Sequence, residues 1–166
     1  HLVSFPSGEP FGKLVFELAS DAVPKTVENF KQLAQGVTVG DKKNPKTASY
    51  KGCRFLRLSA EGLQTGDALQ REDGKGNDSI YTSATNGSLF DDEVFGVYSH
   101  VLGVLSMVNS GPNSNGSQFF ICRGTYPYLD SRCVSFGTLV EGHDVLQSLI
   151  EALQPFTDTA ALLVQQ

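Results

Sequence analysis

Only two stretches of this chain carry apolar residues at helical spacing, and this limits the folds that are open to it. The first is residues 20–36, where Ser20 or Asp21 can cap a helix and Pro24 suits its first turn. The second is residues 143–153. Two amphipathic helices cannot cover both faces of a sheet of many strands, but they can close the two ends of a barrel.

The remaining apolar segments are short and alternate between apolar and polar residues, which is typical of β-strands. Seventeen glycines and seven prolines separate them with turn sequences, and residues 59–99 are expected to be mostly loop. The expected strands are residues 1–5, 11–18, 53–58, 103–108, 118–122, 133–140 and 159–166. Six to eight short strands and two helices predict a single mainly-β domain, residues 1–166, built on a small closed or sandwiched antiparallel sheet.

Charge and hydropathy argue against two classes of partner. The net charge is −5 and the isoelectric point about 5.1, so the chain lacks the basic surface that nucleic acid requires. The one basic cluster, residues 40–46, has the sequence of a solvated surface loop rather than an anion site. No apolar run approaches the roughly 18 residues of a membrane span, and no signal peptide pattern opens the chain. We therefore expect no nucleic-acid and no membrane partner, while a chain that opens at His1 rather than Met fits a longer native protein.

Cysteine and histidine usage argues against disulfides, metals and cofactors. Cys53, Cys122 and Cys133 are odd in number, lack C-x-x-C spacing and fall in apolar strand patterns, so we expect buried free thiols. Such thiols indicate a reducing intracellular compartment, most simply the cytoplasm. The three histidines are far apart and have no ligand at metal-binding spacing. Paired carboxylates in an apolar setting, a G-x-S-x-G turn and a phosphate-binding glycine loop are also absent, so no metal and no cofactor are expected.

The stretch "SGPNSNGSQFFICRG", residues 110–124, joins a long polar loop to an apolar strand. Alternation puts Phe119 and Ile121 on one face of this strand and Gln118 and Phe120 on the other. If the first pair fills the core, the second pair faces outward and forms a small apolar pocket with a polar wall. The alternative is a strand that is buried on both faces, and alternation alone leaves both interpretations open.

The order of four sequence segments resembles that of the cyclophilin-type peptidyl-prolyl cis-trans isomerases. The segments are "VPKTVENFKQL", "GVLSMVNSGPNSNGSQFFI", "YLD" and "VSFGTLVEGHDVL", and the resemblance covers about residues 3–153. It implies a closed eight-stranded antiparallel β-barrel capped by two α-helices. It also implies an isomerase that acts on X–Pro bonds, needs no cofactor and binds proline-containing peptides or proteins in a groove on the outside of the barrel.

The resemblance also implies site residues that alternation alone would not select. An arginine between Leu56 and Leu58 normally points to solvent, yet Arg57 corresponds to the family's catalytic arginine. Gln118 and Phe120 correspond to the glutamine and the pocket phenylalanine of the active groove. The implied substrate-binding residues are Leu63, Gln64, Val108, Asn109, Ser110, Tyr128, Leu129 and Cys133.

The sequence departs from the family pattern mainly on one side of the groove. Residues 58–63, "LSAEGL", are one residue shorter than the family's segment and lack its pocket phenylalanine, while its methionine is at best Leu63. Cys133 replaces a histidine, Val108 replaces a smaller alanine and Tyr128 replaces a tryptophan. Because loss of one aromatic contact costs about 1.5–3 kcal/mol of burial, we expect reduced isomerase activity.

A second hypothesis is a non-catalytic cyclophilin fold that serves as an interaction or structural subunit of a larger protein assembly, such as a cytoskeletal or ribonucleoprotein complex. It is motivated by the altered residues 58–63, by the irregular residues 37–51 and 70–96, and by the acidic net charge. The two hypotheses are compatible with each other. An isomerase assay tests the first, and co-purification at fixed stoichiometry tests the second.

Overall fold

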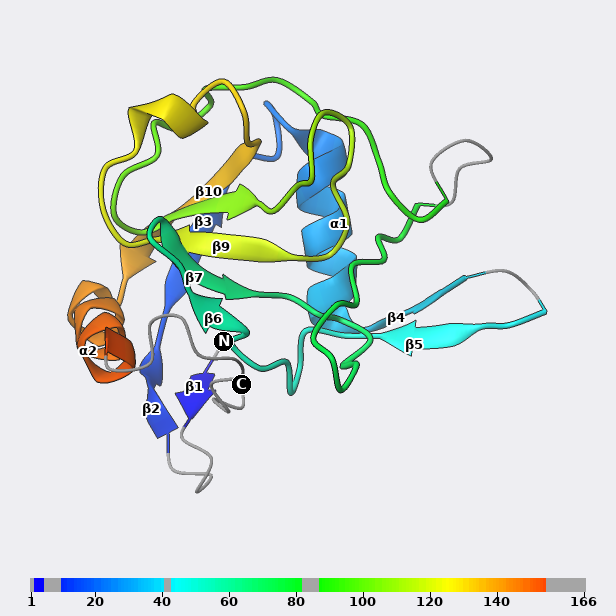
Figure 1. Ribbon diagram of the computed structural model, residues 1–166, viewed down its shortest axis with the longest axis horizontal. Coiled ribbons are helices and arrows are strands. Elements are labelled where there is room, and N and C mark those ends of the chain that lie inside the picture. The colour runs from blue at the N-terminus through cyan, green and yellow to red at the C-terminus, as the bar shows by residue number, and fades with distance from the viewer. Residues whose placement is uncertain (1, 5–9, 41–42, 82–86, 155–166) are drawn as a thin grey trace.

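The central element of the molecule is a six-stranded antiparallel sheet (Figure 1). The structure, a computed structural model, describes residues 2–4, 10–40, 43–81 and 87–154. Across the sheet the strands follow the order β3–β10–β8–β9–β7–β6. Their bounds are Val15–Leu18 (β3), Arg57–Leu58 (β6), Gly62–Thr65 (β7), Val104–Met107 (β8), Phe119–Cys122 (β9) and Ser135–Glu141 (β10). Of these strands, β7 falls in the region that the sequence predicted to be mostly loop.

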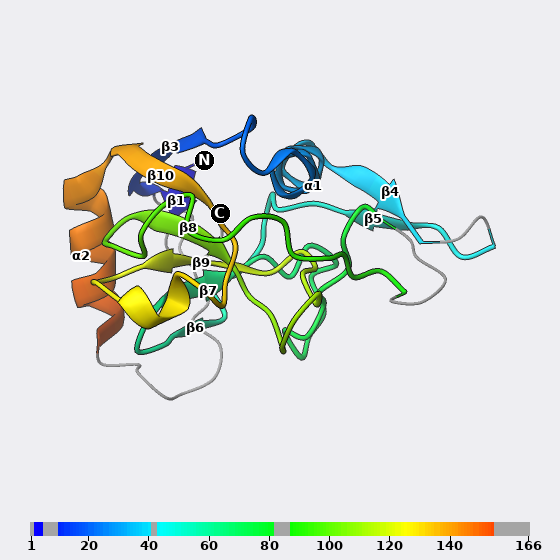
Figure 2. The same ribbon diagram turned by 90° about the horizontal axis from the view of Figure 1, so that it is seen from above.

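Two hairpins lie outside this sheet. Strand β1 (Leu2–Ser4) pairs with β2 (Pro10–Lys13), and β4 (Val37–Val39) pairs with β5 (Lys46–Ala48). The β4–β5 hairpin extends away from the body of the molecule (Figure 2). Leu14 separates β2 from β3, so one expected strand contributes to two different sheets.

The mainly-β architecture with two helices is confirmed, but the closed eight-stranded barrel is wrong for the part of the chain that the structure describes. There the six-stranded sheet ends in two edge strands, β3 and β6, and β1 and β2 pair only with each other. A closed barrel needs continuous strand pairing, yet only the last two residues of the expected strand 53–58 pair with β7. Cys53 lies instead in a turn, where its N–H donates to the Tyr50 carbonyl at 3.0 Å. The strand expected at residues 159–166 lies outside the described residues.

Helix α1 (Pro24–Gln35) has Pro24 in its first turn, as expected, but it begins later than the sequence predicted and its cap comes from a distant part of the chain. The N-cap residue is Val23, which supplies no side-chain hydrogen bond, so the expected cap at Ser20 or Asp21 is wrong. Instead the Glu93 carboxylate accepts hydrogen bonds from two N–H groups of the first turn, at 3.1 and 2.8 Å. These are groups that a helix cannot satisfy itself, so Glu93 joins the start of α1 to the loop after β7.

Asn29 is a polar residue on the buried face of α1 and has no exposed surface. Its Nδ2 donates to the Gly116 carbonyl at 2.9 Å, and its Oδ1 accepts from the N–H of Ile80 at 3.0 Å. Because a buried backbone group without a partner is costly, these two bonds fasten the helix both to the loop that precedes β9 and to the segment between β7 and β8.

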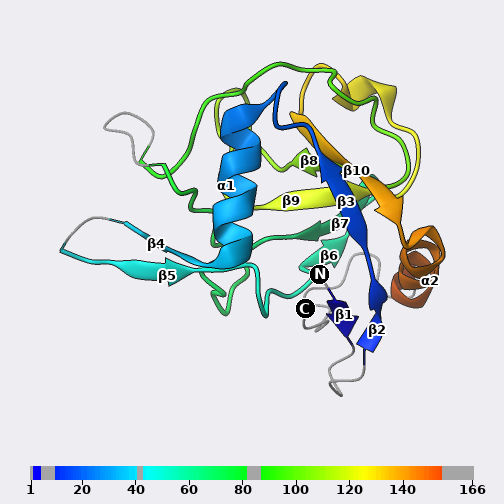
Figure 3. The same ribbon diagram turned by 180° about the vertical axis from the view of Figure 1, so that it is seen from behind.

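Helix α2 (His143–Leu153) has the bounds expected from the sequence and lies away from α1, beside β2 and the end of β10 (Figure 3). Its buried residues are Leu146, Leu149, Ile150 and Leu153. Gly12 of β2 packs directly against this helix, because a Cβ built there would come within 2.6 Å of Cγ1 of Val145. None of the helices in the described ranges is long and apolar enough to cross a membrane.

The main core unites the sheet with the buried faces of both α-helices. At its centre are four aromatic rings whose centroids lie 5.1–6.4 Å apart in contacting pairs. They belong to Phe30, Tyr50, Phe119 and Phe136. These rings come from α1, the loop before Cys53, β9 and β10, so the core unites segments from most of the sequence.

Strand β9 is buried on both of its faces. Phe119 and Ile121 pack into the main core. Phe120 and Cys122 pack into a second, smaller cluster that also contains Val104 and Leu129. The expected division of the strand into two faces is therefore confirmed, and so is the alternative expectation that both faces are buried.

Candidate active site

A pocket of about 130 Å³ opens beside the second cluster, where the β6–β7 turn, the end of β8 and the segment after β9 meet. The residues that line it are Arg57, Ser59, Glu61, Gln64, Val108, Asn109, Phe120, Leu129 and Cys133. The lining therefore comes from three separate regions of the sequence, residues 57–64, 108–109 and 120–133. The pocket combines apolar, amide and charged side chains within a space that suits a single small ring.

The floor of the pocket is apolar. Phe120 and Leu129 line it and are only 8% and 9% exposed, so they are held in place by their neighbours. From below, the ring of His100 stacks on Phe120 with 6.2 Å between centroids and 20° between planes. A rigid apolar floor of this kind can accept a small aliphatic ring without losing side-chain entropy of its own.

The guanidinium of Arg57 is held by a series of hydrogen bonds that runs across three strands, which we name the Gln64 bridge. Arg57 Nε donates to Gln64 Oε1 at 2.8 Å, and Gln64 Nε2 donates to Gln118 Oε1 at 2.7 Å. Gln118 Nε2 in turn donates to the carbonyl of Gly76 at 2.8 Å. The register of β6, β7 and β9 places these side chains on one face, because Arg57 pairs with Gln64 and Gln64 pairs with Phe120.

The Gln64 bridge determines what Arg57 can do. Within the described part of the chain, the guanidinium makes one hydrogen bond, from Nε to Gln64 Oε1. The terminal Nη groups remain for a ligand above the apolar floor. Arginine presents several N–H donors in a fixed plane, so fixing one edge of that plane also fixes the direction of the other donors.

The turn between β6 and β7 carries two pocket residues that sequence reasoning missed, Ser59 and Glu61. The Ser59 hydroxyl accepts a hydrogen bond from the N–H of Glu61 at 3.2 Å and closes the turn. The Tyr128 hydroxyl donates to Glu61 Oε1 at 2.7 Å. This bond lowers the pKa of Glu61 below its usual range and raises that of Tyr128 to about 12. The signal in the sequence was the divergence of residues 58–63, which pointed to a lost contact but not to what replaces it.

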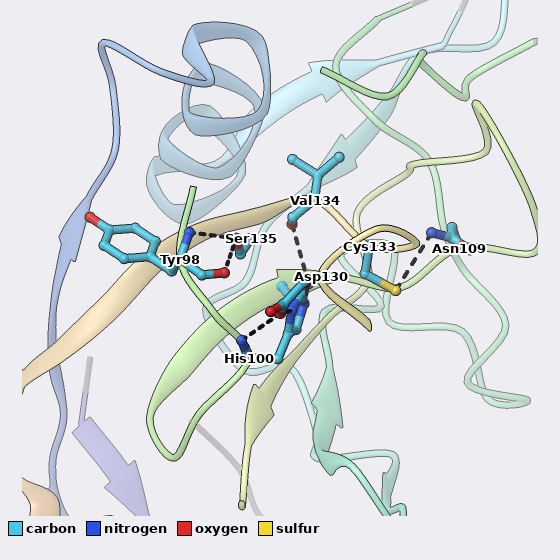
Figure 4. A network of polar contacts seen from close by, with 8 residues as sticks. Tyr98, His100, Asn109, Asp130, Cys133, Val134 and Ser135 are labelled. Carbon is cyan, nitrogen blue, oxygen red and sulfur yellow. Dashed lines mark hydrogen bonds and ion pairs between the residues drawn. The ribbon is translucent and has the colours of Figure 1, made fainter. Parts of the chain in front are cut away.

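The edge of the pocket is formed by Val108 and Asn109. Val108 donates its N–H to the Gln118 carbonyl at 3.1 Å, which fastens the end of β8 to the start of β9. Asn109 Nδ2 donates to the carbonyl of Arg132 at 2.8 Å and contacts Cys133 Sγ at 3.7 Å. Figure 4 shows the Asn109–Cys133 contact, which joins the two sides of this edge.

Below the pocket, His100 is fully buried and connects two polar partners (Figure 4). Its Nδ1 lies 2.6 Å from Asp130 Oδ1, and its Nε2 lies 2.8 Å from Ser106 Oγ. Hydrogen bonds from the backbone and the ring of His100 hold the pKa of Asp130 below its usual range. The order of groups is that of a serine hydrolase triad, but Ser106 has no exposed surface and cannot meet a substrate. We therefore assign this trio to structure, since it ties the segment that carries Leu129 to β8.

The structure brings together most of the residues predicted for the site, and it places four outside the pocket lining. The lining includes Arg57, Gln64, Val108, Asn109, Phe120, Leu129 and Cys133. Gln118 lies behind it in the Gln64 bridge. Tyr128 is 49% exposed and reaches the pocket only through Glu61, while Ser110 is exposed and donates its N–H to Ser114 Oγ. Leu63 has no exposed surface and belongs to the main core, so it cannot touch a substrate in this structure.

A second hollow, about 280 Å³ in volume, lies on another part of the surface. Its lining is mainly polar and consists of Gly52, Arg54, Leu56, Asp67, Gln70 and Glu72. It lacks an apolar floor that could hold a proline ring. Among the described residues no three His, Cys, Asp or Glu side chains are placed to hold a metal ion.

Comparison with known proteins shows the family to which the chain belongs. Residues 3–161 match the model of the family described as cyclophilin type peptidyl-prolyl cis-trans isomerase/CLD. The chain is also similar to the crystal structure of a cyclophilin type peptidyl-prolyl cis-trans isomerase from Cryptosporidium parvum. The sequence identity is 35%, the similarity covers 84% of this chain and 78% of that one, and the TM-score is 0.66. The chain therefore belongs to the cyclophilin-type peptidyl-prolyl cis-trans isomerases.

Proposed function

We propose that the pocket above Phe120 is the site of isomerisation, that Arg57 is its catalytic residue, and that the activity is reduced. The observation that carries the proposal is the position of the Arg57 guanidinium, which the Gln64 bridge holds beside the apolar floor. Phe120 and Leu129 would hold the proline ring. Gln118 is a positioning residue in this proposal, because it acts through Gln64 rather than on the substrate.

The chemistry follows from amide resonance. An X–Pro bond rotates over a barrier of about 18–20 kcal/mol, because the planar amide has partial double-bond character. Rotation localises the lone pair on the proline nitrogen, and a guanidinium N–H can donate to that nitrogen only when the amide is twisted. Arg57 therefore binds the twisted amide better than either planar form, which is the condition for lowering the barrier. No bond is made or broken, so neither a nucleophile nor a cofactor is needed.

An exchange assay with a proline peptide tests this role of Arg57. We expect the wild type to accelerate cis–trans exchange and Arg57→Ala to lower kcat/KM by about 10²–10³-fold, the effect of removing one donor to a transition state. Arg54→Ala is the matched control, because Arg54 donates to the Arg71 carbonyl outside the pocket. A wild type no faster than buffer, or an Arg57→Ala variant with full activity, would reject the proposal.

The reduced activity rests on the composition of one wall. The β6–β7 turn supplies Ser59 and Glu61, two polar residues, where an aromatic contact is missing. Such a contact is worth about 1.5–3 kcal/mol, or roughly ten- to a hundredfold in proline binding. We expect kcat/KM in the lower part of the range of about 10⁴–10⁸ M⁻¹s⁻¹ that enzymes span.

We also propose that the protein works in a reducing intracellular compartment and binds proline-containing proteins there. All three cysteines are free, Cys53 and Cys122 are buried, and burial raises the pKa of each of these two thiols to about 12. Unreactive free thiols support a reducing intracellular compartment such as the cytoplasm. Membership of a larger assembly is a second proposal, and the size of the native complex in a cell extract tests it.

A further inference from the structure

One wall of the pocket carries a negative charge that isomerisation itself does not require. Among the described residues that line the pocket, only Glu61 and Arg57 are charged. Arg57 has a role in the proposed mechanism, whereas Glu61 has none. Glu61 also lies in the turn that lacks the pocket phenylalanine of the family pattern. This wall therefore differs from the family pattern in charge as well as in size.

The structure holds the Glu61 carboxylate in one position. The Ser59 hydroxyl accepts from the N–H groups of Glu61 and Gly62, at 3.2 and 3.1 Å, and fixes the turn. The Glu61 carbonyl accepts from the N–H of Arg123 at 3.0 Å, which joins the turn to the end of β9. The Tyr128 hydroxyl then orients the carboxylate from the side. A group that is ordered before binding loses little entropy when a ligand reaches it.

The same contacts keep Glu61 ionised. The hydrogen bond from Tyr128 is the main cause of its lowered pKa, and Ser59 and the charge of Arg57 act in the same direction. Within the described residues Glu61 forms no ion pair. An ordered carboxylate that forms no ion pair on the wall of a pocket attracts a cation from a ligand and repels an anion.

We propose that Glu61 is a specificity-determining residue, which selects peptides with a lysine or arginine directly before or after the proline. The inference rests on the proposed function of the pocket as a proline site. Arg57 lies over the amide and repels a cation, so the basic side chain lies on the Glu61 side of the pocket. The two opposite charges thereby set the direction in which a peptide lies across the floor.

The test compares peptides that differ only beside the proline. Lysine, glutamine or glutamate is placed before the proline in one series and after it in another. For each peptide the dissociation constant and kcat/KM are measured with the wild type, with Glu61→Gln and with Tyr128→Phe. Glu17→Gln is the control for net charge, because Glu17 is exposed on β3, outside the pocket lining.

In at least one series we expect the wild type to prefer lysine over glutamine by about two- to fivefold, the size of a partly exposed ion pair, and to disfavour glutamate. The preference for the lysine peptide over the glutamine peptide should approach one in Glu61→Gln and at high salt. It should fall partway in Tyr128→Phe and stay unchanged in Glu17→Gln. Equal ratios in the wild type and Glu61→Gln would overturn the inference, and so would a Glu61→Gln variant that raises kcat/KM for all peptides by one factor. If no peptide is isomerised, the proposed function fails, but the dissociation constants still decide whether Glu61 selects the basic peptide.

Discussion

At the scale of single residues, Gln64 has the most specific role in the pocket, because it connects the side chain of Arg57 on β6 with that of Gln118, directly before β9. It accepts from Arg57 and donates to Gln118, so one amide satisfies both neighbours at once. An isolated arginine on a two-residue strand would sample many rotamers. The bridge removes that freedom, and it does so before any substrate is bound.

We predict that Gln64→Leu lowers kcat/KM by about tenfold, which corresponds to loss of roughly one hydrogen bond to a charged group. The decrease should appear mainly in kcat, because the proline floor of Phe120 and Leu129 is unchanged. Gln147→Leu on the exposed face of α2 is the control and should match the wild type. Steady-state kinetics on a neutral proline peptide give kcat and KM for each variant. An unchanged kcat in a folded Gln64→Leu protein would contradict the role of the bridge.

Single residues also show where reading the sequence succeeds and fails. Alternation separated Phe119 from Phe120, because the period of a strand is two and is visible locally. The resemblance alone implied a substrate-binding role for Leu63, whereas the structure buries this side chain in the main core. Glu61 was missed because its contact with Tyr128 joins residues 67 positions apart, and no local pattern reports such a contact.

At the scale of elements, helix α1 shows how a distant side chain can replace a local cap. Its first turn is satisfied by Glu93, which also accepts from the hydroxyl of Thr26 at 2.8 Å. The segment that carries Glu93 thereby stays against the helix. A negative charge at this end of a helix is favourable as well, because the free N–H groups carry partial positive charge.

The prediction for this element is that Glu93→Ala destabilises the protein by about 0.5–2 kcal/mol, the usual effect of losing an N-cap. Asp21→Ala, which removes the acid that the sequence suggested as the cap, should change the free energy of unfolding by less than about 0.5 kcal/mol. Urea denaturation of both variants measures the difference. If Asp21→Ala proved to be the more destabilising change, the assignment of the cap to Glu93 would be incorrect.

The helices were easier to predict than the strands for a physical reason. Helix α2 has its expected bounds because its apolar stripe lies within eleven residues and its end signals, Gly142 and Pro155, lie directly beside them in the sequence. Strand β7, "GLQT", has a glycine, two polar residues and no alternation that stands out, so nothing local marks it. It is a strand because β6 and β9 pair with it on either side. Pairing of that kind depends on residues far away in the sequence.

At the scale of the whole molecule, the β1–β2 hairpin is joined to the rest of the protein through α2. The contact is close at Gly12, where a Cβ would meet Val145 Cγ1 at 2.6 Å and Cγ2 at 2.7 Å. A β-branched side chain in a helix has little freedom to move aside. The position therefore accepts glycine alone while Val145 is present.

We predict that Gly12→Ala destabilises the folded protein by about 1–3 kcal/mol through overpacking. The double variant with Val145→Ala should be no less stable than Val145→Ala alone, because the smaller side chain leaves room for the added methyl group. Thermal or urea unfolding of the wild type, both single variants and the double variant gives the coupling energy. Strict additivity would show that the two residues do not meet.

The fold class was predictable from the count of helices and strands, and closure of the sheet was not. Closure depends on whether edge strands find each other, which is a property of pairing over long sequence distances. Within the described ranges the short β6 and the separate β1–β2 hairpin leave the sheet with edges. The candidate site was predictable to a larger degree, because the resemblance carries residue positions directly, whereas Ser59 and Glu61 lie in residues 58–63, where the sequence departs from the family pattern.

Asn29 has a consequence for anyone who redesigns this protein for stability. In a helical projection it looks like a defect, a polar residue among apolar ones, and an automated choice would be leucine. That exchange would make α1 more hydrophobic and would leave the Gly116 carbonyl and the Ile80 N–H without partners in the interior. It would also release the loop from which Gln118 and Phe120 follow. Asn29 therefore connects α1 to the loop that leads into the pocket residues of β9.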